Sequence, residues 1–293
     1  DSEVQVFKVR LSDLESRCNA CKKKSGHEYY IPLRHFTISN LPRDDFDEDV
    51  VQLVRAIADL TVKITLAEVS SERPEFWPGT RVPYPFYELR GKKCKRSATG
   101  FIVDILEHNF KHETKQCYCH QCPDKNKEPC QYWWEITILT ASHAIFDNLE
   151  AKNTSCRLFY DEINSPSIKI REMIVDDLRN FDIKTDKRFI KYVTCDYETK
   201  STIDRLKMNL EKIKYKSFKD PEKRVILVSH PHGGPKQISI KTWCDVFSDG
   251  EFTKYTYNAP TCPGSSGAPV YILGCTYTDL VHSGTFNDVN YSG

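Results

Sequence analysis

The feature that most constrains the fold of this chain is a succession of short apolar stretches with strand character after about residue 60. Residues 61–69 read TVKITLAEV, in which apolar and polar side chains alternate, and residues 133–139 read WWEITIL. Further stretches of the same kind cover 100–106, 188–194, 224–229, 237–240, 268–273 and 279–282. Many short strands separated by Gly, Pro and polar turns are typical of barrels and sandwiches. The sequence therefore predicts a mostly β fold.

Two helices interrupt this pattern. In the segment 46–60, Phe46, Val50, Leu53, Ile57 and Leu60 recur at spacings of three and four, and acidic residues cluster at its start, as the helix dipole favours. We expect an amphipathic helix that braces the core rather than one that binds a partner. A second apolar face over residues 203–213 predicts a helix that links two β domains.

The chain is long enough for two domains and a leading segment. Its 293 residues predict about two domains of roughly 150 residues each. We assign residues 1–60 to an N-terminal extension, 61–200 to a first barrel and 201–293 to a second.

Net charge and hydropathy argue against two classes of partner. The chain holds 42 basic and 41 acidic residues, which gives a net charge of +1 and no basic surface of the kind that nucleic acids attract. No apolar run reaches the ~20 residues of a membrane span, and the first ten residues do not resemble a signal peptide. We expect a protein or peptide as substrate, and neither nucleic acid nor membrane as partner.

The strongest chemical signal is the sequence PGSSGAPV at residues 263–270. A serine between glycines, on a turn that enters an apolar strand, suits an exposed nucleophile. Gly264 allows its own N–H and that of Ser266 to point at one place, where they would form an oxyanion hole. An ordinary hairpin turn is the alternative interpretation of the same residues.

A histidine phrase accompanies the serine phrase. Residues 138–144 read ILTASHA, so that His143 stands where a strand ends, 123 residues before Ser266. The Thr-Ala-x-His and Gly-x-Ser-Gly-x-Pro phrases resemble the histidine and serine motifs of the trypsin-like peptidases. Residues 229–233 (SHPHG) and 96–102 (RSATGFI) resemble two further strands of that group, although Ala98 and Thr99 replace the small residues expected there.

This resemblance extends from about residue 61 to residue 293. It implies two six-stranded antiparallel β-barrels of the chymotrypsin type. It also implies a serine endopeptidase that works through an acyl-enzyme, with Ser266 as nucleophile and His143 as general base. No Ile-Val-Gly-Gly-like phrase precedes the first strand, so activation by insertion of a new N-terminus is not expected.

The aspartate that would orient His143 has two candidates. The family places it between the histidine and the serine, at the start of a strand. Asp186 precedes the apolar stretch RFIKYVT and is our first choice, whereas Asp182 stands in a phrase that resembles the family's Asn-Asp-Ile. Asp196 ends the same strand and would point elsewhere.

Substrate preference is suggested by two residues near the ends of the serine segment. Pro260 stands where an aspartate would favour basic side chains at P1, the substrate residue before the cleaved bond. Thr261 and His282 resemble the S1 pocket, which binds P1, of glutamyl endopeptidases. Their donors could bind the carboxylate or amide of Glu or Gln at P1. In the alternative, His282 only lines a pocket for a hydrophobic residue.

Five of the twelve cysteines sit in short clusters, at 18–21 and 117–122, and such spacing suits a metal ion better than a disulfide framework. Cys117, Cys119, Cys122 and Cys130 could close a tetrahedral structural zinc site in a polar loop. Cys18 and Cys21 could complete that site in place of Cys130, or could bind separately with His27. Disulfides and free thiols are the alternatives. No cofactor is expected for catalysis itself.

The clustered thiols favour a reducing, cytoplasmic location. Two glycosylation sequons, at Asn153 and Asn290, favour secretion instead. A second class of function also stays open, namely a latent or inactive protease-like domain that serves as a binding or regulatory module.

Overall fold

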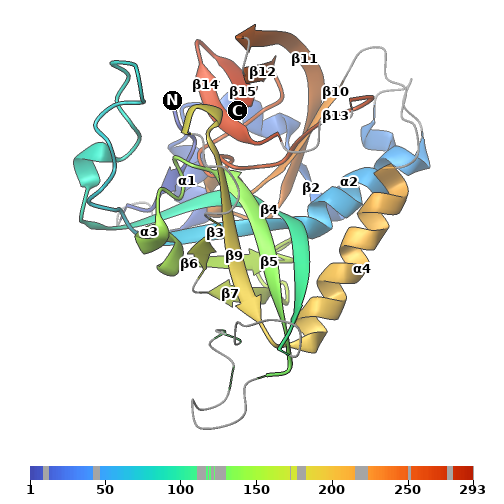
Figure 1. Ribbon diagram of the computed structural model, residues 1–293. Helices are drawn as coiled ribbons and strands as arrows, with labels where there is room; N and C mark the ends of the chain where they lie inside the picture. The colour runs from blue at the N-terminus through green and yellow to red at the C-terminus, as the bar shows by residue number, and fades with distance from the viewer. Residues whose placement is uncertain are drawn as a thin grey trace.

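Two curled antiparallel sheets form the body of the molecule (Figure 1). The computed structural model describes residues 1–8, 13–41, 47–110, 117, 119, 122, 130–171, 173–176, 183–214, 224–249, 252–275 and 280–292. Within these ranges the fold is mostly β, as the strand pattern predicted.

The first sheet has the strand order β7-β6-β3-β4-β5-β9-β8, with β1 paired to β4. Its strands are β1 (Gln5–Val6), β3 (Thr61–Glu68), β4 (Lys93–Asn109), β5 (Tyr132–Ala141), β6 (Thr154–Leu158), β7 (Ile168–Arg171), β8 (Ile174–Val175) and β9 (Lys187–Thr194). Val62, Ile64 and Leu66 of β3 are fully enclosed in the core. The buried face of β3 is therefore the one that the alternation of apolar and polar residues predicted.

The second sheet has the order β13-β10-β11-β12-β15-β14, with β2 paired to β11. Its strands are β2 (Ile31–Pro32), β10 (Arg224–Ser229), β11 (Gln237–Asp249), β12 (Phe252–Tyr257), β13 (Val270–Ile272), β14 (His282–Phe286) and β15 (Val289–Ser292). Every residue of β10 is buried, as expected of a strand covered on both faces.

Two long helices lie side by side along the sheets (Figure 1). Helix α2 (Glu48–Leu60) begins at Asp47, whose side chain accepts a hydrogen bond from the Asp49 N–H. The expected start at Phe46 lies outside the described residues. Helix α4 (Tyr197–Lys214) turns Ile203, Leu206, Leu210 and Ile213 inward, and α2 packs against it.

The remaining helices are short. They are α1 (Leu14–Asn19), η2 (Lys24–Tyr29), η3 (Leu33–His35), η4 (Ile38–Asn40), η6 (Tyr87–Leu89), α3 (Asn148–Lys152), η7 (Ile183–Thr185) and η8 (Pro231–Gly233). In the described part of the chain, no helix has the length and apolar character needed to cross a membrane.

The first 60 residues contribute to both sheets. Strand β1 pairs with β4 through Gln5↔Ser97, and β2 pairs with β11 through Ile238↔Ile31. The segment assigned to an extension is thus hydrogen-bonded to the two sheets, and it brings the N-terminus against β14 through a bridge between Ser2 and Gly284. The division at residues 60 and 200 stays a prediction.

Candidate active site

The register of β5 and β9 brings His143 and Asp186 together. Ala141, the last residue of β5, pairs with Lys187, the first residue of β9, so that the turns beyond them meet. Asp186 Oδ2 lies 2.7 Å from His143 Nδ1, and His143 Nε2 lies 2.7 Å from Ser266 Oγ. The three side chains therefore form one hydrogen-bonded row, which is the geometry that a serine nucleophile and its base require.

Asp186 is held by its neighbours as well as by the imidazole. Its Oδ1 accepts hydrogen bonds from the Ser142 hydroxyl at 2.8 Å and from the His143 N–H at 3.0 Å. Burial by itself would raise the pKa of this carboxyl, but His143 and these donors outweigh burial and lower the pKa. The group is thus an ionised carboxylate at neutral pH. Asp182 lies outside the described residues.

The loop that carries Ser266 depends on two glycines with positive φ. A Cβ at Gly264 (φ +109°) would lie 2.3 Å from the His230 carbonyl oxygen, and one at Gly267 (φ +81°) would lie 2.2 Å from Thr140 Oγ1. Only glycine fits both positions. The loop is also tied to β4, because the Thr99 N–H donates to the Ser266 carbonyl at 2.9 Å.

The chain's own N-terminal residues fill the space in front of the serine. The Glu3 carbonyl oxygen accepts from the Gly264 N–H at 2.5 Å and from the Ser266 N–H at 3.3 Å. The Glu3 N–H donates to Ser266 Oγ at 3.0 Å. Ser2 forms an antiparallel bridge with Gly284 on β14, and the Thr285 N–H donates to the Asp1 carbonyl at 3.0 Å. Residues 1–3 thus lie as an added strand on β14, with one carbonyl held by two converging N–H groups.

The Glu3 side chain enters a polar pocket on the second sheet. His282 Nε2 lies 2.8 Å from Glu3 Oε2, and the Thr285 hydroxyl donates to Oε1 at 2.9 Å. The Lys23 ammonium forms an ion pair with the same carboxylate. Burial opposes ionisation of Glu3, but His282 and Lys23 outweigh it and lower the pKa to about 2.

Hydrogen bonds from neighbouring residues orient the side chains that line this pocket. The Tyr257 hydroxyl lies 2.7 Å from His282 Nδ1, so the two ring nitrogens face the tyrosine and the carboxylate. Thr261 makes no hydrogen bond to Glu3. Its hydroxyl donates to Asn290 Oδ1 at 2.8 Å, and the Thr285 hydroxyl oxygen lies 2.9 Å from the same atom. Of the two residues expected here, His282 contacts the carboxylate directly, whereas Thr261 accepts a hydrogen bond at 3.3 Å from Lys23, which pairs with that carboxylate.

Sequence reasoning missed Glu3, Lys23 and Thr285 in this pocket. Thr285 follows His282 by three residues on the same strand, a spacing that points two side chains to opposite faces of a regular strand. The bulge between His282 and Gly284 brings both side chains to the pocket, and no local pattern marks it. Lys23 carries no local signal, because it comes from a segment more than 230 residues away along the chain.

The four cysteines expected to bind zinc lie near the end of β9 in two overlapping groups rather than one. Cys117, Cys119 and Cys122 form the first, and Cys122 and Cys130 form the second with Cys195. Sγ–Sγ distances are 3.3 Å for Cys117 and Cys119, 3.4 Å for Cys119 and Cys122, and 3.4 Å for Cys122 and Cys130. A fifth thiol, Cys195, lies 3.5 Å from that of Cys119. Cys195 follows β9 and was missed, because nothing in its local sequence marks it.

Cys21 and His27 lie elsewhere, beside the serine loop. Their ligand atoms form a group with those of His232 and Cys262, and Cys18 belongs to no such group among the described residues.

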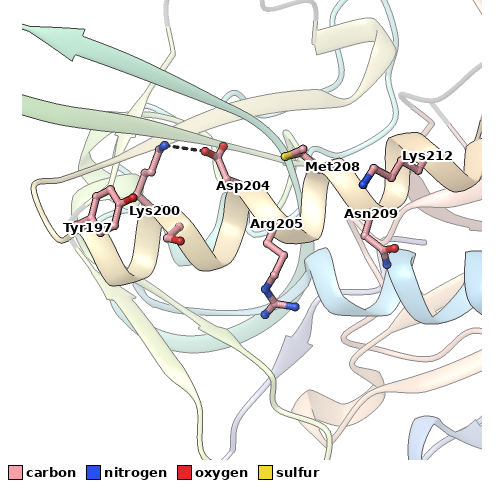
Figure 2. A pocket seen from close by; sticks show the side chains of 8 residues that line it. Tyr197, Lys200, Asp204, Arg205, Met208, Asn209 and Lys212 are labelled. Atoms are coloured by element: carbon pink, nitrogen blue, oxygen red, sulfur yellow. Dashed lines mark ion pairs between the residues drawn. The ribbon is translucent and has the colours of Figure 1, made fainter.

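A hollow of about 580 Å³ lies on the surface of α4, away from the triad. It is lined mostly by charged and polar side chains of a single helix, together with Met208, and includes the ion pair of Lys200 and Asp204 at 2.7 Å (Figure 2). An (i, i+4) pair of this kind is an ordinary feature of an exposed helix face.

Comparison with known proteins gives structural neighbours only. No protein family and no curated protein matches the sequence. The Rv3671c protease from M. tuberculosis in its active form is 14% identical, with a TM-score of 0.42 over 84% of this chain and 81% of that one. The inactive form of this protease is 12% identical, with a TM-score of 0.39 over 84% of this chain and 89% of that one. The serine endoprotease from Yersinia pestis is 12% identical, with a TM-score of 0.41 over 82% of this chain and 60% of that one.

These neighbours are serine proteases, but likeness at such identities and TM-scores carries no argument about activity. The function is therefore inferred from the geometry of the site.

Proposed function

We propose that this protein is a serine endopeptidase of the chymotrypsin type, which cleaves peptide bonds through an acyl-enzyme. The observation that carries the proposal is the row Asp186–His143–Ser266, at 2.7 Å for each step, facing the N–H groups of Gly264 and Ser266. Two N–H groups that already converge on a peptide carbonyl are the donors that a tetrahedral intermediate needs. The two curled sheets would correspond to the two barrels of this type, although they hold eight and seven strands in the described part of the chain rather than the expected six each.

Each residue then has one role in the reaction. His143 Nε2 takes the proton of Ser266 Oγ while this oxygen adds to the substrate carbonyl carbon. The N–H groups of Gly264 and Ser266 stabilise the resulting oxyanion. His143 then gives its proton to the leaving amine, and a water molecule hydrolyses the acyl-enzyme by the same sequence of proton transfers. Asp186 holds the imidazole in the tautomer whose Nε2 faces the serine.

We also propose that the enzyme prefers Glu over Gln at P1. The Glu3 carboxylate in the pocket receives hydrogen bonds from His282 and Thr285 and an ion pair from Lys23. A hydrogen bond to a charged group exceeds that to a neutral amide by about 1 kcal/mol, so we expect kcat/KM to be about fivefold higher for Glu.

One feature favours a latent form of the same site. Ser266 is fully buried, because Glu3 covers it. A regulatory or binding role would follow if nothing displaced this segment. The experiment below therefore includes a variant whose segment fits the pocket poorly.

A fluorophosphonate probe and P1-variable peptides test the proposal together. We expect Glu3→Ala to be labelled and to cleave peptides after Glu, whereas Ser266→Ala should do neither. Lys23→Met should reduce the preference for Glu over Gln while sparing probe labelling. Cleavage after Leu or Arg would contradict the P1 preference, and an unlabelled, folded Glu3→Ala protein would contradict the enzyme.

For the cysteine group at the end of β9, we propose a structural zinc ion held by four of the five thiols Cys117, Cys119, Cys122, Cys130 and Cys195. Thiolate is a ligand that zinc binds well, and distances of 3.3–3.5 Å between sulfurs suit a shared ion. Zinc content of purified protein and of Cys119→Ser tests this. Oxidised thiols and no zinc at this site would leave disulfides as the better interpretation.

A further inference from the structure

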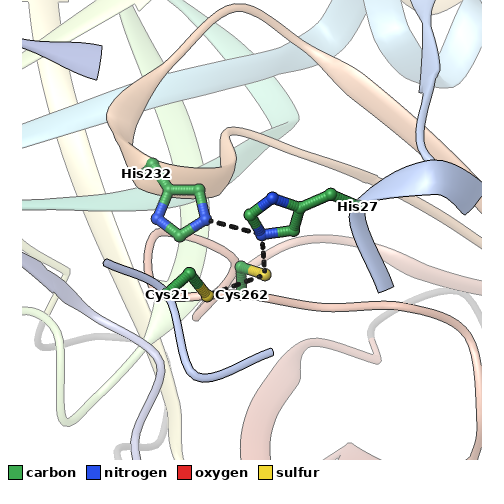
Figure 3. A group of neighbouring side chains, drawn as sticks. All are labelled: Cys21, His27, His232 and Cys262. Atoms are coloured by element: carbon green, nitrogen blue, oxygen red, sulfur yellow. Dashed lines mark hydrogen bonds between the residues drawn. The ribbon is translucent and has the colours of Figure 1, made fainter. Parts of the chain in front are cut away.

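A second group of metal-binding side chains lies beside the loop that carries Ser266 (Figure 3). Cys21 and His27 come from the N-terminal segment, His232 from η8, and Cys262 from the loop itself, four residues before the serine. Their four ligand atoms lie within 4.8 Å of one another. Figure 3 shows the two imidazoles and two thiols pointing at a common centre.

The separations match the edges of a tetrahedron around a zinc ion. Cys21 Sγ lies 3.6 Å from Cys262 Sγ, Cys262 Sγ lies 3.3 Å from His27 Nε2, and His27 Nε2 lies 3.2 Å from His232 Nε2. Zn–S bonds of about 2.3 Å and Zn–N bonds of about 2.0–2.1 Å give tetrahedral edges of about 3.8, 3.5 and 3.3 Å for the same pairs. Both cysteines are free, so no disulfide accounts for their approach.

Surrounding groups orient these ligands. His232 Nδ1 lies 3.1 Å from Gln5 Oε1, an acceptor for its N–H, which leaves the Nε2 lone pair facing the centre. The Lys23 N–H donates to Cys21 Sγ at 3.3 Å, as backbone N–H groups can for a thiolate. His232 and Cys262 are almost completely buried.

We propose that Cys21, His27, His232 and Cys262 bind one structural zinc ion. Four protein ligands fill a tetrahedral shell and leave no position for substrate, which excludes a catalytic role for the ion. The ion would join the N-terminal segment to Cys262, two residues before Gly264. It would therefore hold both the oxyanion loop and the segment that delivers Lys23 to the pocket.

Metal analysis of purified protein tests the site directly. We expect Cys21→Ser to bind one equivalent of zinc less than the unmodified chain, and the matched control Cys18→Ser to bind as much as the unmodified chain. Equal zinc in Cys21→Ser and the unmodified chain would overturn the proposal, as would a Cys21–Cys262 disulfide in the unreduced protein.

A ligand-preserving variant covers the case in which Cys21→Ser does not fold. His27→Cys keeps four ligands but changes the set from two to three thiolates. In the cobalt-substituted protein it should retain full metal content and strengthen the thiolate-to-cobalt charge-transfer absorption. An unchanged cobalt spectrum would show that His27 does not bind the metal.

A different observation, the placement of residues 1–3, carries a second inference, which rests on the proposed function. Glu3 has its carbonyl in the oxyanion hole, its side chain in the S1 pocket and its N–H on Ser266 Oγ. Its carbonyl carbon lies between that nitrogen and the oxygen that accepts from the Ser266 N–H, two atoms that both contact Ser266. On the other side of the bond, β1 pairs with β4 and fixes the residues that follow Val4.

We infer that the enzyme cleaves its own Glu3–Val4 bond. Ser266 Oγ would bond to the Glu3 carbonyl carbon, and the C–N bond to Val4 would break as His143 protonates the departing amine. Water would then hydrolyse the ester, regenerate Ser266 and release residues 1–3 with a free Glu3 carboxylate. Val4 would become the new N-terminus, and the S1 pocket would be open to other substrates.

Intact mass and N-terminal sequencing test this step. We expect a product that begins at Val4, formed at a rate independent of protein concentration, and absent in Ser266→Ala and Glu3→Ala. An uncleaved chain in a preparation that hydrolyses Glu peptides would make residues 1–3 an inhibitor and overturn self-cleavage alone. Failure of Glu3→Ala to cleave any peptide would instead overturn the proposed function.

Discussion

At the residue scale, the candidate site depends on buried charges whose partners set their ionisation. Asp186 and Glu3 are both enclosed, and both have a lowered pKa because an imidazole and further donors face the carboxylate. The first would serve catalysis by orienting His143. The second, Glu3, lies in the pocket where the side chain of a substrate would bind.

Replacing Asp186 by Asn should reduce kcat by about 10⁴-fold with little change in KM. The amide can donate to His143 Nδ1 and so favours the tautomer whose Nε2 already carries a proton. Steady-state kinetics on a Glu peptide measures the loss. As a control, a circular dichroism spectrum should show the fold unchanged; a loss below tenfold would argue that Asp186 is not the triad acid.

Glu3 should make stability depend on pH in the acid range. Because its pKa falls from 4.5 unfolded to about 2 folded, its contribution is present above about pH 4.5 and is lost as the pH drops toward 2. In a Ser266→Ala background, which prevents cleavage, the unfolding free energy should fall by about 2 kcal/mol more between pH 5.5 and pH 3 than in Ser266→Ala with Glu3→Gln. Urea titrations at the two pH values measure this; parallel curves would contradict the ion pair.

At the element scale, α3 supports the turn that presents His143. Glu150 on this helix forms an ion pair with Arg73 at 2.7 Å and lies 3.3 Å from Arg96, and all three side chains are fully buried. Arg73 also donates to the carbonyl oxygens of His143 at 2.9 Å and Ala144 at 3.2 Å. The charged cluster thus holds the backbone of the turn that carries His143.

Glu150→Gln should destabilise the fold by about 3–5 kcal/mol, because two guanidinium groups would lose their buried counter-charge. Denaturant unfolding measures the change. Glu162→Gln is the matched control, since Glu162 pairs with Arg34 on the surface at 3.5 Å, where an ion pair contributes at most about 1 kcal/mol. Equal effects of the two substitutions would refute the role of the cluster.

At the scale of the whole molecule, two groups of thiols and imidazoles join segments that are far apart in the chain. One joins the connection between β4 and β5 to the end of β9, and the other joins the N-terminal segment to the turn after β10 and the serine loop. A metal ion at each place would close long loops and stabilise the folded state.

Removal of metal by a strong chelator should therefore lower the Tm, and added zinc should restore it. The double variant Cys21→Ser, Cys119→Ser has lost a ligand from each group and should show a low Tm that the chelator does not change further. Calorimetry measures both proteins. A chelator-resistant Tm in a zinc-containing protein would show that the ions are not structural.

The sequence by itself determined the features whose signals are local. Alternation along β3 identified a half-buried strand, and the spacing of apolar residues identified α2 and the inward face of α4. The phrases around His143 and Ser266 singled out two side chains that lie 2.7 Å apart in the fold. Each of these signals lies within a few residues, because strand pleat, helix turn and nucleophile loop are local geometries.

Only the tertiary structure decided which distant residues share a site. The register of β5 and β9 brought Asp186 to His143, and the added strand at β14 brought Glu3 to His282. Lys23 reaches the Glu3 carboxylate from the segment just before η2. Cys195 joined the cysteine cluster, and His232 and Cys262 joined Cys21 and His27, for the same reason. A contact between residues 200 positions apart is set by how sheets pair and pack, and no pattern in either local segment records it.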